Sequence, residues 1–242
     1  MLKILFSPSE GKKCGGETNK MELFGATNAR DEILQAYNNI VLSQDEEKIL
    51  QLFGLKKWDD AQQYIEDIFN SPTMSAIERY EGVAYDYLDF TSLSLEAQDF
   101  AKEHTIIFSN LFGPILAKDF IPTYKVKQGN SIGEIAPDKF YKERFAYQLD
   151  LYLTNADILD LRAGYYDKFY KPNKKYTTLK FLKNGKTLSH WAKAYRGLVL
   201  REIAKHKIDS LEAFAKLEIE NLQIKEILKK KNKTEIIYDI IG

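Results

Sequence analysis

The chain has 242 residues, of which 44% are hydrophobic and 29% charged, and its formal net charge is zero, the composition of an ordinary globular protein. The single cysteine, Cys14, excludes an internal disulfide, and no apolar run approaches the roughly 18 residues of a membrane span. We therefore expect a soluble, cytoplasmic protein with no membrane partner.

The chain opens with a predicted strand, MLKILF (1–6), which Pro8 closes. A buried strand is expected at 104–113, and 147–153 and 157–161 fit a strand or a helix equally well. A hairpin turning on Asn184 and Gly185 and a final strand over 234–241 follow from the turn and apolar patterns. Helices are expected at 29–40, 44–54, 59–69, from 71 onward, at 95–103, at 191–205, and in a last segment that ends in EILKKKNK (226–233).

Strands and helices alternate along the chain, with one apparent hairpin among them. This pattern predicts the α/β class (mixed α+β), with a central mixed sheet surrounded by helices. No internal repeat, low-complexity tract or Gly/Ser-rich linker divides the sequence. We expect residues 1–242 to form a single compact domain.

Charge is unevenly distributed although its sum is zero. Residues 59–103 hold eleven acidic and two basic side chains, a net charge of −9. Residues 162–207 hold thirteen basic and two acidic side chains, a net charge of +11. The basic segment predicts a surface that attracts phosphates. Alternatively, the two segments pack together and neutralise each other.

The loop FSPSEGKK (6–13) directly follows the first predicted strand and holds more polar groups than a surface turn needs. Ser7 and Ser9 offer hydroxyls, a glycine permits a turn that presents backbone N–H groups, and Lys12 supplies positive charge. The spacing is not that of a P-loop, so no NTPase is predicted. The loop suits a bound anion, with Glu10 as a general base or as the partner of a lysine.

Four further segments combine aromatic side chains with polar or basic ones: 79–88, 106–115, 120–129 and 160–172. In the last two, this mixture suits stacking on nucleobases. The alternatives are aromatic core packing for 79–88 and a salt-bridged, aromatic-rich edge for 160–172. The candidate ligand-binding residues in these segments are Tyr85, Ser109, Gly113, Tyr124, Lys125, Arg162 and Tyr166.

The segment LSHWAKAYRG (188–197) contains the strongest local group of candidate functional residues. It predicts a helix with His190 at its entrance and with His190, Lys193 and Gly197 on one face. Glycine inside a helix costs about 1 kcal/mol, which indicates that something approaches the helix closely at Gly197. His190 and Lys193 join Glu10 as candidate catalytic residues, although a capping or hydrogen-bonded role suits His190 equally well. The binding candidates on this helix are Lys193, Arg196, Gly197 and Arg201.

Cofactor motifs are missing from the sequence. Three histidines and one cysteine are scattered without the spacing of metal ligands. There is no Gly-rich dinucleotide fingerprint and no Gly-x-Ser-x-Gly elbow. We predict no metal site and no cofactor.

Taken in order, these motifs resemble the YaaA family of peroxide-stress proteins, in the branch with an N-terminal Ser-Glu-Gly-Lys motif. The resemblance implies a single α/β domain with a helix-hairpin-helix-like element near Leu111–Asp119. It also implies DNA binding in a positive cleft and a role in limiting free iron and the damage that iron drives. Lys118, which the resemblance makes a further binding candidate, and Lys125 stand where members often carry arginine. The matching segments are SPSEGKK (7–13), RYEGVAYDYL (79–88), SNLFGPILAKDFIPTYKV (109–126), DLRAGYY (160–166) and SHWAKAYRG (189–197).

Two functions are compatible with these residues. The first is a peroxide-stress protein that binds duplex or structured DNA, largely independently of sequence, through a basic cleft. The second is an enzyme acting on a small phosphorylated or nucleobase-like metabolite in the same cleft, because its side chains offer more acid–base chemistry than backbone binding requires. In both cases we expect the SPSEGKK loop, His190 and Lys193 to converge and to share one anionic ligand, with Glu10 and Lys12 within about 10 Å of Lys193. The sequence leaves the oligomeric state open.

Overall fold

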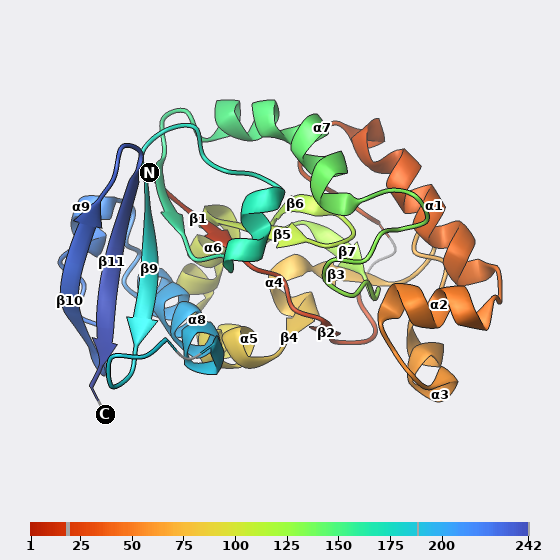
Figure 1. Ribbon diagram of the computed structural model, residues 1–242, viewed down its shortest axis with the longest axis horizontal. Coiled ribbons are helices and arrows are strands. Elements are labelled where there is room, and N and C mark those ends of the chain that lie inside the picture. Colours follow the sequence, from red (N-terminus) through yellow and green to blue (C-terminus); the bar gives the residue numbers. More distant parts are fainter. Residues whose placement is uncertain (18–19, 188, 242) are drawn as a thin grey trace.

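A seven-stranded mixed sheet forms the centre of the computed structural model, which describes residues 1–17, 20–187 and 189–241 (Figure 1). Its strands are β1 (Leu2–Phe6), β5 (Thr105–Ser109), β6 (Gly113–Leu116), β8 (Asp157–Asp160), β9 (Tyr176–Leu182), β10 (Leu222–Lys229) and β11 (Lys233–Ile240). They lie in the order β10-β11-β9-β8-β1-β5-β6. Neighbours from β11 to β5 run parallel, and the outer strands β10 and β6 run antiparallel to theirs. The predicted fold class and mixed sheet are confirmed.

Helices surround this sheet. In Figure 1, α1 to α3 lie at the end of the molecule opposite β10 and β11. α8 packs against β9 and α5, α6 contacts β1 and α8, and α7 contacts β6. In the part of the chain that the structure describes, no helix is long and apolar enough to cross a membrane. The helices are α1 (Asp31–Leu42), α2 (Glu46–Phe53), α3 (Trp58–Ala61), α4 (Ala76–Arg79), α5 (Val83–Leu88), α6 (Leu95–His104), α7 (Pro137–Tyr152), α8 (Ser189–Lys205) and α9 (Leu211–Phe214).

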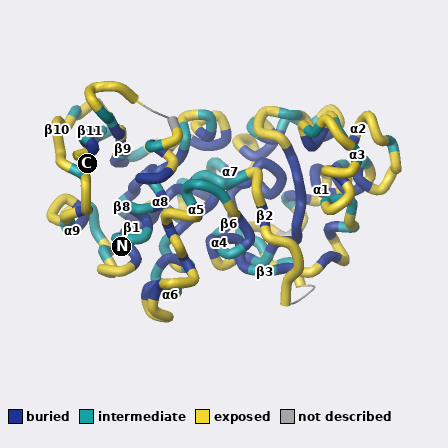
Figure 2. The backbone as a smooth tube through the Cα atoms, turned by 90° about the horizontal axis from the view of Figure 1, so that it is seen from below, coloured by how far each residue is buried: buried dark blue, intermediate teal, exposed yellow. Residues whose placement is uncertain are grey.

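The central strands β1 and β5 are buried along their whole length. This is expected of parallel strands that are covered on both faces, and Figure 2 shows the buried backbone running through the middle of the molecule. One charged side chain lies on β1. Lys3 reaches the edge of the core, where its Nζ donates to the carbonyl of Glu103 at 2.7 Å and to the hydroxyl of Tyr152 at 3.0 Å.

Two of the predicted helices begin and end where their capping residues stand. The Asp45 carboxylate accepts from the backbone N–H of Lys48 at the start of α2, and Gly54 ends that helix in the left-handed conformation with φ 67°. The hydroxyl of Ser94 accepts from the N–H of Ala97 at the start of α6. The expected helices at 29–40, 44–54, 95–103 and 191–205 are confirmed within a few residues.

Of three other expected helices, two form only in part and the last is wrong. Segment 59–69 is helical only in α3 and a short 3-10 turn, because the Asp67 carboxylate accepts from the N–H of Phe69 and the side chain of Asn70, which closes a turn instead. Segment 71–80 begins as strand β3 (Thr73–Ser75), which pairs with β7 (Phe120–Pro122), before it enters α4. The last expected helix is strand β10, which pairs with β11.

The structure shows which of the segments that fit a strand or a helix equally well is helical, and it shows how the chain turns at the predicted hairpin. Residues 147–152 belong to α7, and 157–160 form β8. Asn184 and Gly185 have φ of 52° and 75°, as a tight two-residue turn requires. The second arm is only the bridge between Lys183 and Lys186, and the chain then enters α8.

The helix-hairpin-helix-like element expected near Leu111–Asp119 is not confirmed, because this segment turns between β5 and β6 and continues along β6. Gly113 adopts φ 65° at the turn, and the ring of Tyr141 packs against it. The buried guanidinium of Arg30 donates to the carbonyls of Phe112 and Pro114, both at 2.7 Å. These bonds hold the turn and satisfy its carbonyls inside the protein.

Candidate functional site

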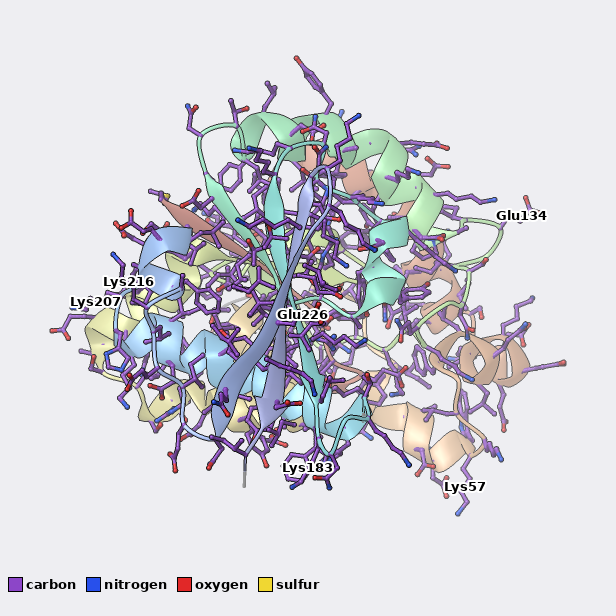
Figure 3. The ribbon with its side chains drawn as sticks, turned by 60° about the vertical axis from the view of Figure 1, so that its left-hand side comes forward. Lys57, Glu134, Lys183, Lys207, Lys216 and Glu226 are labelled. Atoms are coloured by element: carbon purple, nitrogen blue, oxygen red, sulfur yellow. The ribbon has the colours of Figure 1, made fainter. Side chains whose placement is uncertain are left out.

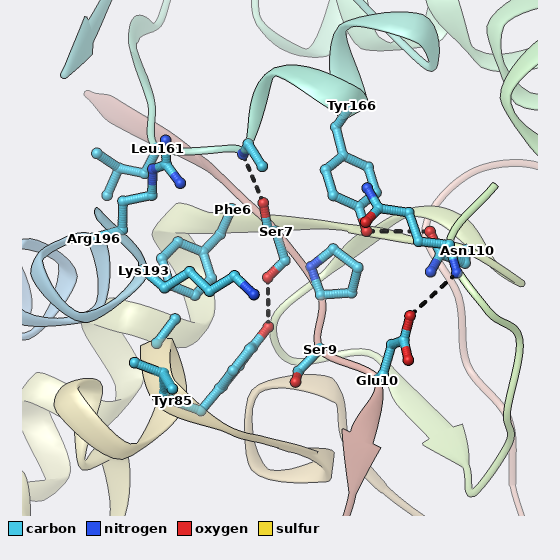
Figure 4. Close-up of a pocket in the computed structure, with 15 residues that line it drawn as sticks. Phe6, Ser7, Ser9, Glu10, Tyr85, Asn110, Leu161, Tyr166, Lys193 and Arg196 are labelled. Carbon is cyan, nitrogen blue, oxygen red and sulfur yellow. Dashed lines mark hydrogen bonds between the residues drawn. The ribbon is translucent and has the colours of Figure 1, made fainter. Parts of the chain in front are cut away.

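A cavity of about 440 Å³ opens where the carboxyl ends of three parallel strands meet (Figure 4). Ser7–Glu10 follow β1, Asn110 follows β5, and Leu161 and Ala163 follow β8. β1 lies between β5 and β8, with later strands of the chain on both sides of it. The cavity therefore lies at the point where the strand order reverses. Open α/β sheets commonly bind their ligands at such a point. α5 and α8 complete the wall.

The loop after β1 is tied to both neighbouring walls. The hydroxyl of Ser7 accepts from the N–H of Ala163 at 2.8 Å, and the carbonyl of Ser7 accepts from the hydroxyl of Tyr85 at 2.9 Å. Ser9 lies against Gly82, where an added Cβ would come within 2.8 Å of the serine hydroxyl. The loop that the sequence singles out therefore forms a wall of the cavity, and these hydrogen bonds fix it in place.

Lys193 and Arg196 supply positive charge from one side of the cavity. They are three residues apart on α8 and both line the cavity. The described ion pairs along α8 involve Arg201 and Lys205 instead. Burial lowers the pKa of Arg196 from its usual value, with Asp160 acting in the opposite direction. The charge of both side chains is thus available to an anion.

Glu10 and Asn110 form the other polar end of the cavity. Figure 4 shows them on the side opposite Lys193 and Arg196. The Glu10 carboxylate accepts a long bond, 3.4 Å, from the N–H of Gln128. The hydroxyl of Tyr166 donates to Oδ1 of Asn110 at 3.1 Å.

Lys12 is buried behind the loop and does not line the cavity. Its Nζ donates to the carbonyl of Ser9 at 3.0 Å and to that of Glu10 at 3.3 Å, and it lies 4.1 Å from the ring centroid of Tyr124. Burial, with the charge of Lys125 as a second cause, lowers the pKa of Lys12 from 10.5 to about 7. Lys12 therefore supports the loop from below, and only Glu10 of the expected pair shares the cavity with Lys193.

The buried Lys12 predicts a specific pH dependence of stability. Between about pH 7 and 10.5 the unfolded chain keeps the Lys12 proton that the folded chain has released, so stability should rise with pH in that window. In urea unfolding at several pH values, the unfolding free energy of the wild type minus that of Lys12→Met should increase from pH 7 to pH 9.5. A constant difference would contradict the buried, partly neutral lysine.

Ser109 and Tyr124 belong to the core and do not line the cavity. The hydroxyl of Ser109 accepts from the N–H groups of Leu111 and Phe112 and lies 2.7 Å from that of Tyr124. The Tyr124 hydroxyl lies 2.8 Å from that of Tyr80, and burial raises the pKa of Tyr80 to about 12. These groups stay protonated at physiological pH and join β5 to the segment that carries Tyr124.

Four further candidates lie outside the cavity. Gly113 is in the β5–β6 turn, and Lys118 forms an exposed ion pair with Glu103 at 2.8 Å. Lys125 is buried, with its ammonium 5.3 Å from a tyrosine ring centroid. Arg162 is buried in a bidentate bond with Asp160. Each of these positions is explained by internal packing or pairing.

The other α8 candidates also serve structure. His190 is exposed at the start of the helix and is not part of the cavity lining. Gly197 faces the backbone of Ala84. The element that approaches α8 closely at this glycine is therefore α5. Arg201 donates to the carbonyls of Leu88 and Asp89 at 2.9 and 2.8 Å and thereby caps the end of α5.

The basic and acidic segments partly pack together, through α5 against α8 and the 3.4 Å ion pair between Arg201 and Asp89. Lys174 donates to three carbonyls between residues 153 and 156. Figure 3 shows Lys183 and Lys207 pointing outward at different sides of the molecule. Lys183 and Lys207 therefore do not belong to one patch.

Sequence reasoning missed several residues of the cavity: Asn110, Gln128, Leu161, Ala163, Val83 and Ala84. Asn110 and Leu161 directly follow buried strands and Ala163 comes shortly after one, so the rule that ligands bind at the carboxyl ends of parallel strands points to them. Gln128 comes from a loop with no such signal. Among the described residues, no group of three His, Cys, Asp or Glu side chains could hold a metal ion.

Comparisons with known proteins confirm the family that the motifs indicate. The family model of the peroxide stress protein YaaA matches residues 2–228. An uncharacterized protein of Campylobacter jejuni subsp. jejuni is 45% identical over 249 residues, covering 99% of this chain and 100% of its own. A UPF0246 protein of Corynebacterium glutamicum is 31% identical and one of Streptomyces coelicolor 29%, each covering 84% of this chain and, respectively, 85% and 82% of its own. The chain belongs to the YaaA family of peroxide stress proteins, to which its UPF0246 relatives also belong.

Proposed function

We propose that the protein serves the peroxide-stress response by binding a phosphate-bearing ligand in the cavity, and that DNA is its source. In this proposal, binding helps to limit iron-driven oxidative damage to DNA. The observation that carries the proposal is the pair Lys193 and Arg196, which lines the cavity without an ion-pair partner among the described residues. Lysine and arginine together offer a point charge and a planar fork to phosphate oxygens.

The size of the cavity limits how DNA can use it. Its volume of about 440 Å³ is in the range of small-molecule sites, so it can hold a part of the DNA about as large as one nucleotide. A duplex would contact the rim through its backbone, and one unstacked nucleotide would enter. Unstacking costs a few kcal/mol in a duplex and least where the base is already unpaired. We therefore expect bubbled or single-stranded DNA to bind more tightly than a perfect duplex.

The double variant Lys193→Ala/Arg196→Ala should weaken binding of bubbled DNA at least tenfold at about 100 mM salt. Each lost phosphate contact should also reduce the slope of log affinity against log salt by about 1. Fluorescence anisotropy between about 50 and 200 mM salt measures both quantities.

The matched control for this experiment is Lys205→Ala, which removes one exposed positive charge from the same helix outside the cavity. It should leave the affinity nearly unchanged. Binding that is independent of salt, no binding at micromolar protein, or equal losses in the control and the double variant would each contradict the proposal.

A second candidate function is an enzyme acting on a small phosphorylated or nucleobase-like metabolite. The observation that favours it is the Glu10 carboxylate, which lines the cavity opposite the cation pair and accepts only one long bond from a described residue. Such a carboxylate can take a proton from a bound ligand. Mass spectrometry of nucleotides incubated with the protein would show a product with the wild type and none with Glu10→Gln. Unchanged nucleotides in both samples would exclude this alternative for the ligands tested.

A further inference from the structure

The cavity has a hydrogen-bond donor that no described residue uses. Asn110 is 6% exposed and lines the cavity, and its Oδ1 is occupied by the Tyr166 hydroxyl. No described residue bonds to its Nδ2. In the described part of the chain, the buried atoms that lack both a partner and solvent contact are Thr105 Oγ1 and Gln148 Oε1. The Nδ2 of Asn110 is therefore open to the cavity and ready to donate.

An acceptor accompanies this donor at the same end. The Glu10 carboxylate is exposed in the cavity and makes one bond of 3.4 Å with a backbone N–H, so most of its accepting capacity is free. Figure 4 shows Glu10 and Asn110 together on one side of the cavity and Lys193 and Arg196 on the other. The space thus runs from a cationic end to an end with one amide donor and one carboxylate acceptor.

Apolar and aromatic side chains line the space between these ends. Phe6, Val83, Tyr85, Leu161 and Tyr166 contribute to the lining. The hydroxyls of Tyr85 and Tyr166 are occupied by the carbonyl of Ser7 and the amide of Asn110. What these two tyrosines offer a ligand is mainly ring surface, which suits a flat heterocycle.

We infer that the cavity is a guanine-nucleotide site, an inference that rests on the phosphate site proposed above. The phosphate lies at Lys193 and Arg196, and the base lies at Asn110 and Glu10. On its pairing edge, guanine presents the acceptor O6 beside two donors, N1–H and the exocyclic amine. Asn110 Nδ2 donates to O6, and one carboxylate accepts from both nitrogens. Adenine, cytosine and thymine offer only one donor nitrogen on that edge, so they leave part of the carboxylate unpaired.

Two nearly isosteric variants test the base end. Glu10→Gln replaces a carboxylate oxygen with a donor. Asn110→Asp keeps the acceptor for Tyr166 and removes the free donor. Because Glu10 is exposed, Glu10→Gln should fold normally even if Asn110→Asp is destabilised. Calorimetric titration measures the affinity of each protein for guanosine 5′-monophosphate, adenosine 5′-monophosphate and ribose 5-phosphate. The two nucleotides test the base end of the cavity, and ribose 5-phosphate tests the phosphate end alone.

For the wild type, guanosine monophosphate should bind at least tenfold more tightly than adenosine monophosphate. Both variants should lose this preference while ribose 5-phosphate binds as before. Equal affinity for all three phosphates in the wild type and both variants would overturn the guanine site and leave the phosphate proposal intact. Failure of all three to bind, or binding that is unaffected by Lys193→Ala/Arg196→Ala, would overturn the phosphate proposal and the guanine site with it.

A second binding experiment distinguishes a nucleotide within DNA from a free nucleotide. Oligothymidylate with one central dG should bind more tightly than the same strand with one dA if the nucleotide comes from DNA. Equal binding of the two strands, together with a preference for free guanosine monophosphate, would identify the free nucleotide as the ligand. No preference for guanine in either experiment would overturn the inference.

Discussion

Arg162→Met should lower the free energy of unfolding by about 3–5 kcal/mol, the usual cost of removing one partner from a buried ion pair. The Arg162 side chain is 1% exposed and that of Asp160 is 7% exposed. The guanidinium donates to both carboxylate oxygens of Asp160, at 2.8 and 2.7 Å, and to the carbonyl of Tyr166 at 3.1 Å. Methionine fills much of the space but leaves the Asp160 carboxylate without its counter-charge. Urea unfolding followed by circular dichroism measures the loss.

The control for Arg162→Met is Lys118→Met, which breaks an ion pair of similar length at the surface. Lys118 and Glu103 approach to 2.8 Å, but their side chains are 45% and 59% exposed. Exposed pairs contribute at most about 1 kcal/mol, so this variant should be nearly as stable as the wild type. Equal losses in the two variants would mean that burial does not govern the strength of the Arg162 pair.

Gly197→Ala should destabilise the protein by about 1–3 kcal/mol, although alanine is the better helix former. A Cβ at position 197 would lie 2.8 Å from the carbonyl carbon of Ala84 and nearer still to its oxygen. Backbone atoms of α5 cannot turn aside as a flexible side chain does, so α5 and α8 would have to separate. Both helices line the cavity, and ligand affinity should fall together with the melting temperature.

Gly164→Ala is the matched control for Gly197→Ala. Nothing lies within 4 Å of a Cβ at this position, and its backbone conformation does not require glycine. The substitution should therefore be neutral or slightly stabilising, because alanine restricts the unfolded chain. A Gly197→Ala protein that is as stable as the Gly164→Ala protein would show that α5 and α8 are less closely packed than the structure has them.

Much of the fold could be predicted because local and tertiary preferences agree. β1 and β5 are short apolar runs that the sheet buries, and α2 and α6 begin at capping side chains. The last expected helix failed where the two preferences conflict. The segment LQIKEILK suits a helix by intrinsic propensity, but pairing with β11 places it at the edge of the sheet. Such pairing depends on a partner strand that a local pattern does not contain.

The candidate site was predicted in part, for a related reason. The loop after β1 and the cations on α8 are rich in charge, and the structure brings Glu10, Lys193 and Arg196 to one cavity. Residue type alone does not tell a binding arginine from a structural one: Arg162 forms a direct ion pair with the buried Asp160, and Arg196 forms none with a described residue. Asn110 follows a buried strand, which points to the site, but the sequence does not show that its amide Nδ2 has no partner among the described residues while its Oδ1 does.

The most direct test of the central claim is a crystal structure of the protein grown with guanosine 5′-monophosphate. We expect phosphate oxygens within hydrogen-bond distance, about 3 Å, of both the Lys193 ammonium and the Arg196 guanidinium, with the base extending toward Asn110 and Glu10. A nucleotide bound elsewhere on the molecule, with the cavity empty at saturating concentration, would contradict it.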